Sequence, residues 1–224
     1  NAIIAAAKKG VGQGAPLMSE NNARSQIAAI EARRGFTLSD EQKTAALALL
    51  SGRNTVQIIQ GDAGSGKSAL FAFVDEVAKT AGPAPLFLTS QAALVADMRA
   101  DGLDAQTLAS LLVRHGGQGG RTALSAEGRS LLSGRLVVVE EASMIASRDA
   151  ALLINLTTRA GAAKLAFVGD VKQIGSVGAG RPFALMQENG APTETLSENR
   201  RQINPALREA VACARAGDIA GTFA

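Results

Sequence analysis

The sequence is poor in the side chains that several common kinds of functional site require. It contains one cysteine (Cys213), one histidine (His115), seven phenylalanines, and no tryptophan or tyrosine among 224 residues. A single cysteine cannot form a disulfide within the chain, and one histidine cannot build a zinc site alone. We therefore expect Cys213 to be a small buried residue on a helix and His115 to lie in a loop. We also expect a reducing, cytoplasmic compartment.

Long hydrophobic runs are also absent. No stretch approaches the roughly 18 apolar residues that a membrane-spanning helix needs, and no basic segment precedes the mildly apolar residues 2–7 as in a secretory signal. Hydrophobic residues make up 46% of the chain and charged residues 19%, which predicts a globular protein with a sizeable core. Because the chain begins at Asn1, we expect it to belong to a longer polypeptide.

Nucleic-acid binding receives weak support from composition. The net charge of +3 permits such a partner without arguing for it. Single-stranded nucleic acids are usually held by aromatic faces that stack on the bases. With so few aromatics, Phe36, Phe183, contacts to the phosphate backbone, or a platform outside these residues would have to serve.

Residues 61–68 (GDAGSGKS) match the phosphate-binding pattern G-x-x-x-x-G-K-[ST]. An apolar stretch over 56–59 precedes the motif and a helix-like stretch over 69–74 follows it, as the motif requires. Glycines let the backbone turn tightly and direct N–H groups at phosphate oxygens, and the following helix presents its positive end to the same anion. We therefore expect ATP and Mg²⁺ as cofactors. Lys67 would reach the β- and γ-phosphates, Ser68 would hold Mg²⁺, and the surrounding loop would be Gly61, Asp62, Ala63, Gly64, Ser65 and Gly66.

Predicted strands and helices alternate along the chain, which indicates βαβ units. This alternation predicts an α/β fold with a doubly wound parallel sheet and helices on both faces. Ser39, with Gln42 three residues later, is a capping-box pattern and predicts a helix start there. Strands are expected near 55–60, 86–88, 135–141, 164–170 and 193–196. Helices are expected near 21–34, 39–52, 68–80, 91–100, 104–113, 122–133, 147–160, 181–187 and 205–216. The glycine-rich residues 1–20 are expected to be a linker or frayed end.

Polar residues follow three further predicted strands, and in a parallel sheet ligands bind at the carboxyl ends of the strands. Glu140 and Glu141 follow a buried apolar strand, where the first would hold Mg²⁺ and the second would orient or deprotonate the attacking water. The alternative is that both begin a solvated helix. Asp170 and Gln173 offer a carboxylate and an amide near the γ-phosphate, or else only a polar turn. Thr89 and Ser90 end the remaining strand.

Six short stretches resemble the motifs of superfamily 1 helicases. They are residues 36–42 (the glutamine motif), 61–68 (motif I), 89–93 (motif Ia), 139–144 (motif II), 168–183 (motif III) and 196–202 (motif IV). Their order and spacing are similar to the 5′→3′ RecD-like branch, superfamily 1B, and most of all to the helicase part of conjugative relaxase–helicases of the TraA/TraI type. The resemblance covers residues 36–216 and implies a RecA-like P-loop NTPase fold.

The resemblance also implies roles for individual residues. Gln42 would contact the adenine, and Thr89 with Ser90 would touch the tracking DNA strand. Gln173 would couple the γ-phosphate to the DNA. Arg201 would neutralise charge in the transition state as an arginine finger, with Arg200 as the alternative. Lys67, Ser68, Glu140 and Glu141 keep the roles given above.

The chain departs from the family pattern in two respects. Motif II usually contains Asp-Glu, whereas Glu140 precedes Glu141 here. Because Mg²⁺ demands near-ideal geometry, slower hydrolysis is expected unless a water-mediated contact absorbs the extra methylene. Motifs V and VI are not present, and without tyrosine this chain cannot nick DNA through a tyrosine. We expect a linker and helix over 1–34, a RecA-like motor domain over 35–192, and the start of a second RecA-like domain over 193–224.

The resulting functional hypothesis is the motor domain of an ATP-dependent 5′→3′ DNA helicase or translocase, which would not unwind DNA by itself. Its implied partners are single-stranded DNA, a relaxase domain in the same polypeptide and the conjugation machinery. One alternative is a non-motor nucleotide-binding module that recognises DNA or a transfer partner. A small-molecule ATPase or kinase is a third hypothesis, which the matches to motifs III and IV disfavour.

Overall fold

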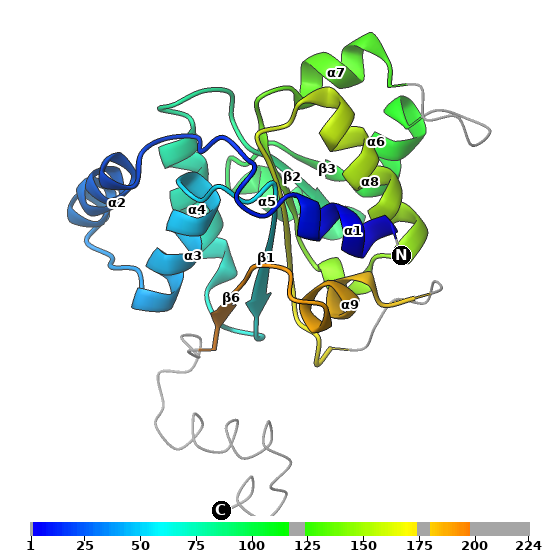
Figure 1. Cartoon of the computed structure of the whole chain (residues 1–224). Helices are drawn as coiled ribbons and strands as arrows, with labels where there is room; N and C mark the ends of the chain where they lie inside the picture. Colours follow the sequence, from blue (N-terminus) through cyan, green and yellow to red (C-terminus); the bar gives the residue numbers. More distant parts are fainter. Residues whose placement is uncertain (1, 117–123, 174–179, 198–224) are drawn as a thin grey trace, which may run out of the picture.

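A computed structural model describes residues 2–116, 124–173 and 180–197, and a parallel sheet lies at its centre (Figure 1). The strands of the six-stranded sheet lie in the order β3-β2-β4-β5-β1-β6, and each neighbouring pair is parallel. They are β1 (Val56–Gly61), β2 (Leu86–Thr89), β3 (Ala105–Thr107), β4 (Leu136–Val139), β5 (Lys164–Gly169) and β6 (Thr193–Leu196). The predicted parallel α/β fold is confirmed.

Helices cover both faces of the sheet. They are α1 (Ala2–Lys9), α2 (Glu20–Arg34), α3 (Asp40–Leu50), α4 (Lys67–Ala78), α5 (Ala92–Ala100), α6 (Leu108–His115), α7 (Ala126–Leu132), the 3-10 turn η1 (Ala142–Met144), α8 (Ser147–Ala160) and α9 (Pro182–Glu188). None of the described helices combines the length and the apolar composition needed to cross a membrane.

Two hydrophobic cores form because side chains alternate along each strand. Ile59 faces the first core, which packs under α2, α3, α4 and α5, while Val56 and Ile58 face the second, under α1, α6, α7, α8 and α9. Figure 1 shows α2, α3 and α4 on one side of the sheet and α1, α8 and α9 on the other. The central strands are buried along their whole length, as the continuous apolar runs predict.

One strand was missed by the sequence prediction. Residues 104–113 are predicted to be helical, but β3 occupies Ala105–Thr107 and only then does α6 begin. The strand is three residues long and lies at the edge of the sheet, paired with β2. Its composition shows no alternation of apolar residues, so its strand state depends on pairing with β2. The predicted helix over 205–216, and with it Cys213, lies outside the described residues.

The prediction of a linker or frayed end over residues 1–20 is wrong for the first half of that segment. Residues 2–9 form α1, whose buried Ile3 and Ala7 lie on one face and pack into the second core against α8 and α9. The following residues run along the loop before β1, where Gly14 N donates to Arg53 O (2.6 Å) and Thr55 N donates to Gly10 O (3.0 Å). The N-terminal segment is therefore part of the domain's packed structure.

The predicted domain boundary at residue 193 also needs correction. β6 pairs with β1 in the same sheet, so residues 193–196 complete this domain. Just beyond it, the backbone N–H and the hydroxyl of Ser197 donate to the Glu41 carboxylate on α3, at 2.7 and 2.6 Å. That a second RecA-like domain begins further along stays a prediction, because residues 198–224 lie outside the described ranges.

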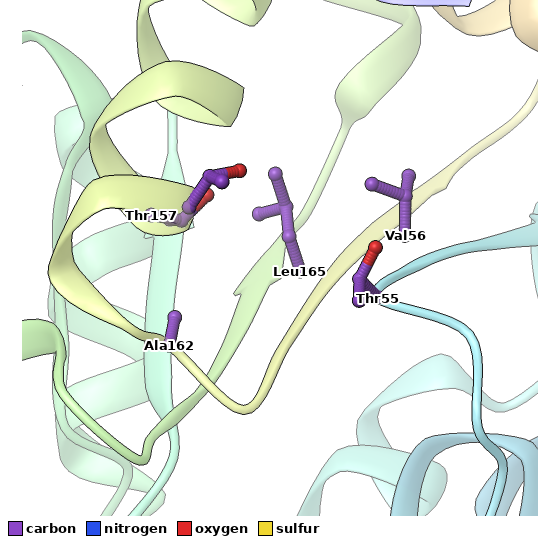
Figure 2. Close-up of a pocket in the computed structure, with 6 residues that line it drawn as sticks. Thr55, Val56, Thr157, Ala162 and Leu165 are labelled. Atoms are coloured by element: carbon purple, nitrogen blue, oxygen red, sulfur yellow. The ribbon is translucent and has the colours of Figure 1, made fainter. Parts of the chain in front are cut away.

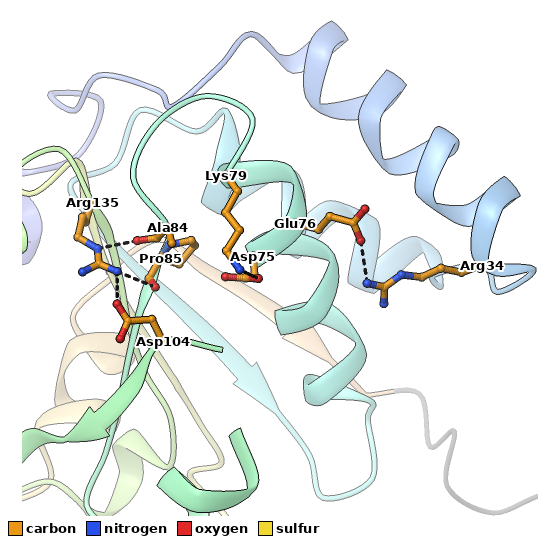
Figure 3. Close-up of polar contacts among 8 residues, drawn as sticks. All are labelled: Arg34, Asp75, Glu76, Lys79, Ala84, Pro85, Asp104 and Arg135. Atoms are coloured by element: carbon orange, nitrogen blue, oxygen red, sulfur yellow. Dashed lines mark hydrogen bonds and ion pairs between the residues drawn. The ribbon is translucent and has the colours of Figure 1, made fainter. Parts of the chain in front are cut away.

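The amino ends of the strands are closed by buried basic side chains. Arg135, just before β4, donates to Ala84 O (2.5 Å) and Pro85 O (3.3 Å) and forms an ion pair with Asp104 (Figure 3). Lys164 of β5 donates to two carbonyl oxygens at the end of α3, and burial lowers its pKa to about 8. A cavity of about 150 Å³ nearby is lined by Thr55, Val56, Thr157, Thr158, Ala162 and Leu165 (Figure 2), and none of these lining residues is charged. The charged groups expected to act on a ligand lie at the opposite edge.

The packing of α1 predicts a measurable contribution to stability. Ile3→Ala should lower the free energy of unfolding by about 2–4 kcal/mol, because it removes a buried side chain from the second core. Ile4→Ala is the matched control: its half-buried neighbouring side chain should cost about 1 kcal/mol or less. Urea unfolding followed by circular dichroism measures both. Equal, negligible effects would mean that residues 2–9 are a frayed end after all.

Candidate nucleotide-binding site

A cavity of about 600 Å³ opens at the carboxyl ends of β1, β4 and β5. The phosphate loop supplies its floor over residues 63–69. Around it lie Phe36, Gln42, Leu94, Glu140, Glu141 and Gln173. The structure thus brings together polar residues that are up to 131 positions apart in sequence (Gln42 to Gln173). It does not bring Asp170, Thr89 or Ser90 into the lining of this cavity.

The glycines of the phosphate loop are required by its backbone. Gly64 and Gly66 both have φ near 80°, in the left-handed region, and Gly66 is the N-cap residue directly before α4. At Gly61 a Cβ would lie 3.0 Å from the Lys67 side chain, which crosses back over the loop. Lys67 Nζ donates to Gly61 O at 3.0 Å. The loop is therefore shaped to keep the lysine along its inner side.

Gln42 supports the loop from beneath. Its Nε2 donates to the carbonyl oxygens of Ser65 (3.2 Å) and Gly66 (3.1 Å), while its Oε1 accepts from Ser39 N (3.0 Å). The last contact and the bond from Gln42 N to the Ser39 hydroxyl confirm the predicted capping box. The side chain is buried and joins the start of α3 to the phosphate loop. Its contact with adenine stays a prediction.

Glu140 and Glu141 form a pair of carboxylates beside Lys67. Burial raises the pKa of Glu140 to about 7, the negative charge of Glu141 adds to that rise, and Lys67 opposes it. The alternative that both residues begin a solvated helix is wrong, because Glu140 is buried and the following turn η1 has three residues. A buried carboxylate this close to a like charge is costly unless a cation or proton joins it.

The backbone of Glu141 is strained. It has φ 51° and ψ 42°, and it is the one non-glycine residue with positive φ among those the structure describes. Such a conformation costs about 1–2 kcal/mol for a residue with a Cβ. Its Oε2 atom is buried and has no hydrogen-bond partner within the described part of the chain. A buried oxygen without a hydrogen bond, on a residue with a strained backbone, is expected of a group that gains its partner only when a ligand binds.

These features fit a magnesium–triphosphate complex. The loop offers backbone N–H groups to an anion, the exposed Ser68 hydroxyl and the Glu140 carboxylate offer oxygen ligands to a hard cation, and Lys67 adds a positive charge.

Comparison with known proteins agrees with this geometry. Residues 37–224 match the family model of an AAA domain. The chain belongs to this family of RecD-like helicase domains. With its parallel sheet and phosphate loop, the domain has the RecA-like P-loop NTPase fold.

The AAA domain is similar to parts of much longer conjugation proteins. It is 32% identical over 189 residues to the probable conjugal transfer protein TraA of Sinorhizobium fredii, covering 82% of this chain and 16% of that protein. It is 31% identical over 178 residues to the multifunctional conjugation protein TraI of Escherichia coli, covering 78% of this chain and 10% of that protein. With the conjugal transfer protein TraA of Rhizobium radiobacter the identity is 33% over 175 residues, covering 76% of this chain and 15% of that protein.

The turn after β5 in the AAA domain is both a polar turn and a part of the cavity wall. Gln173 N donates to Asp170 O at 3.2 Å, and Gln173 lines the cavity. The Asp170 carboxylate is buried and accepts from Gln60 Nε2 (2.9 Å) and Lys172 N (2.9 Å). Gln173 therefore lies in the cavity wall, whereas Asp170 holds the turn together.

The predicted DNA contacts of the AAA domain differ in exposure. Thr89 is fully buried and its hydroxyl accepts from Gln91 N (3.3 Å), whereas Ser90 is exposed. Phe183 is 2% exposed, so its proposed role as a stacking platform for bases is wrong. Phe36 is 42% exposed and borders the nucleotide cavity, where its ring lies 6.2 Å from that of Phe73. Strand binding through Thr89 and Ser90 stays a prediction.

Phe36 follows a charged segment that ties α2 to α4. The Arg34 guanidinium lies 5.2 Å from the centre of the Phe73 ring and forms an ion pair with Glu76 at 2.7 Å (Figure 3). The hydrogen bond to Arg33 and the pair with Arg34 lower the pKa of Glu76, against the opposing effect of burial. These contacts fix the end of α2 and with it the start of the segment that reaches the cavity.

Some predicted site residues cannot be placed, and one contributing residue was missed. Arg200, Arg201 and most of motif IV lie outside the described residues. Gln60, directly before the phosphate loop, was not predicted as a functional residue, although a buried glutamine is unusual in an apolar strand. A polar glutamine within an apolar strand was the signal that could have identified Gln60. Its hydrogen-bond partners could not be predicted in this way, because the tertiary fold brings them together.

The raised pKa of Glu140 predicts a pH-dependent stability. Between about pH 4.5, the usual value, and pH 7, the folded state retains a proton that the unfolded state has lost, so the free energy of unfolding falls as pH rises. Glu140→Gln removes the charge but keeps the shape. At pH 8 the variant should be more stable than wild type by about 1–3 kcal/mol, and the difference should vanish below about pH 4.

Urea unfolding in EDTA across this pH range measures the difference. Glu127→Gln on α7 is the control for charge removal at an exposed position, and it should show no such dependence. A stability gap between Glu140→Gln and wild type that stays constant from pH 4 to pH 8 would contradict the assignment.

Proposed function

We propose that this chain is the ATP-hydrolysing motor domain of a 5′→3′ DNA helicase or translocase that works in conjugative transfer. One observation carries the proposal: a single cavity gathers Lys67, Ser68, Glu140, Glu141 and Gln173, which are the groups that phosphoryl transfer to water requires. The similarity to conjugal transfer proteins supports the biological setting. Since the chain covers between a tenth and a sixth of those proteins, their whole activity is not transferred to it.

Each residue has a proposed task at the triphosphate. Lys67 leaves the Gly61 carbonyl and binds the β- and γ-phosphates, while Ser68 and Glu140 hold Mg²⁺. The bound ion would neutralise negative charge on the phosphate oxygens. Glu141 accepts a hydrogen bond from the attacking water and receives its proton, and Gln173 contacts the γ-phosphate. Gln42 holds the loop and meets the adenine.

Translocation requires more than this domain. We propose that Arg201, or else Arg200, completes the site from a second RecA-like domain, and that single-stranded DNA passes over Thr89 and Ser90. A relaxase domain in the same polypeptide is the proposed partner. Binding of the strand would depend mainly on phosphate contacts and would weaken with salt. One RecA-like domain is expected to bind nucleotide without unwinding DNA.

A second candidate is a non-motor nucleotide-binding module. The observation that favours it is Glu140, whose longer side chain replaces the usual aspartate and whose pKa is raised to about 7. Binding of nucleotide without turnover, in the presence and absence of single-stranded DNA, would identify this function. Turnover stimulated by single-stranded DNA would identify the motor.

Lys67→Ala tests the site itself. In the full-length protein this change should reduce DNA-stimulated ATP hydrolysis below roughly a tenth of the wild-type rate, because it removes the positive charge at the transferred phosphate. Lys79→Ala is the matched control on the same helical stretch: Lys79 pairs with Asp75 at 2.6 Å, far from the cavity lining, and its loss should leave the rate unchanged. Retention of more than a tenth of the activity in Lys67→Ala would refute the site.

A further inference from the structure

Gln60 is a buried polar residue in an apolar strand. It lies in β1 immediately before the phosphate loop, on the same side of the strand as Val56 and Ile58, and it is 9% exposed. A buried primary amide is costly to leave without hydrogen bonds, so its partners define its role.

Those partners come from two other elements. Gln60 Nε2 donates to Asp170 Oδ1 at 2.9 Å, and Gln60 Oε1 accepts from Val171 N at 3.2 Å and from Gln187 Nε2 at 3.3 Å. One side chain therefore joins the strand that leads into the phosphate loop, the turn after β5, and helix α9. One of these hydrogen bonds is buried and two are part-buried, and such a connected set is more rigid than its separate members.

The turn held by Gln60 leads directly to the cavity. Asp170 Oδ1 also accepts from Lys172 N (2.9 Å), and Asp170 O accepts from Gln173 N (3.2 Å). The Lys172 ammonium lies 3.6 Å from the carboxylate of Asp62 in the phosphate loop. Gln60 thus ties the turn to the strand before the loop, Lys172 ties it to the loop itself, and Gln173 is its next residue toward the cavity.

The close approach at Gly169 leaves the turn little freedom to move alone. A Cβ at Gly169 would lie 2.9 Å from Ser143 N in η1 and 3.5 Å from the ring of Phe183 in α9. The end of β5 therefore touches the segment after Glu141 and the helix that Gln60 binds. We therefore expect the turn to move only together with α9, and α9 also packs against α1.

We propose that Gln60 is a positioning residue that holds Gln173 at the phosphate end of the cavity and couples the turn to α9. The inference rests on the proposed nucleotide site. It assigns Gln60 no contact with the nucleotide. Its effect passes through Asp170 and Val171 to Gln173, so its loss should lower the rate of hydrolysis more than the affinity for nucleotide.

The chain offers a matched control on the same strand. Gln57 is also a buried glutamine, but it lies at the other end of β1, where its Nε2 donates to Pro192 O (3.0 Å) and Ile58 O (3.2 Å). Gln60→Leu and Gln57→Leu each remove one buried amide from β1. A purely structural role for Gln60 predicts the same functional result for both variants.

Steady-state ATP hydrolysis by the full-length protein separates these roles. Gln60→Leu should lower kcat by about tenfold or more with KM changed by less than about threefold, whereas Gln57→Leu should leave both near wild type. Hydrogen exchange of residues 170–173 and 182–188 gives a second readout. MgADP should slow exchange in both segments in wild type and Gln57→Leu, and should no longer slow exchange over 182–188 in Gln60→Leu.

A reciprocal change tests the contact itself. Gln60→Glu places a second carboxylate against Asp170 and should lower kcat like Gln60→Leu. Adding Asp170→Asn restores a donor and an acceptor in exchanged positions, so the double variant should recover at least part of the lost kcat.

The outcomes distinguish this inference from the function on which it rests. Wild-type protein that binds no MgATP or MgADP would overturn the proposed function and the inference together. Wild-type protein that hydrolyses ATP, with Gln60→Leu behaving like Gln57→Leu in both kcat and exchange, would overturn the inference alone.

Discussion

The parallel pairing of β4, β5 and β1 is the constraint on which the rest of the structure depends. Parallel strands end at one edge, and here each central strand is buried along its length, so its first polar residues appear only at that edge. This places the carboxylates after β4, the turn after β5 and the phosphate loop after β1 around one cavity. The helices supply little of this chemistry, except that α3 contributes Gln42 and α4 contributes its amino end.

At the carboxyl edge of the sheet, negative side chains outnumber positive ones in the cavity lining. Two carboxylates face a single lysine of the phosphate loop, and burial keeps water from screening them, which explains the raised pKa of Glu140. At the opposite edge Arg135 and Lys164 are buried too, but each donates to at least two carbonyl oxygens. Satisfied polar groups close one end of the sheet, and incompletely satisfied ones mark the end where we propose that a ligand binds.

Local patterns predicted much of the fold and part of the site. The phosphate loop, the capping box of Ser39 and Gln42, and the apolar strands are encoded within a few neighbouring residues, and the structure has each of them. β3 could not be predicted in this way, because three residues of mixed polarity become a strand only beside β2. Glycines around residues 10–14 suggested a linker, although the packing of Ile3 is decided by α8 and α9.

The same limit applies to individual side chains of the site. Phe36 and Phe183 look equally suited to stacking in the sequence, and only the fold buries one and exposes the other. The importance of Gln60 depends on partners 110 to 127 positions away along the chain. The roles predicted for Arg200 and Arg201 depend on residues outside the described ranges.

The left-handed backbone of Glu141 has an evolutionary consequence. Glycine would adopt this conformation without a steric penalty, so the glutamate side chain at this position raises the free energy of the backbone. Random substitution under selection for stability alone would favour glycine there, whereas selection for the carboxylate opposes it. Under the proposed function, the identity of residue 141 in natural variants of this domain would report on hydrolysis: we expect glycine at this position in lineages that keep the fold and lose the proposed activity.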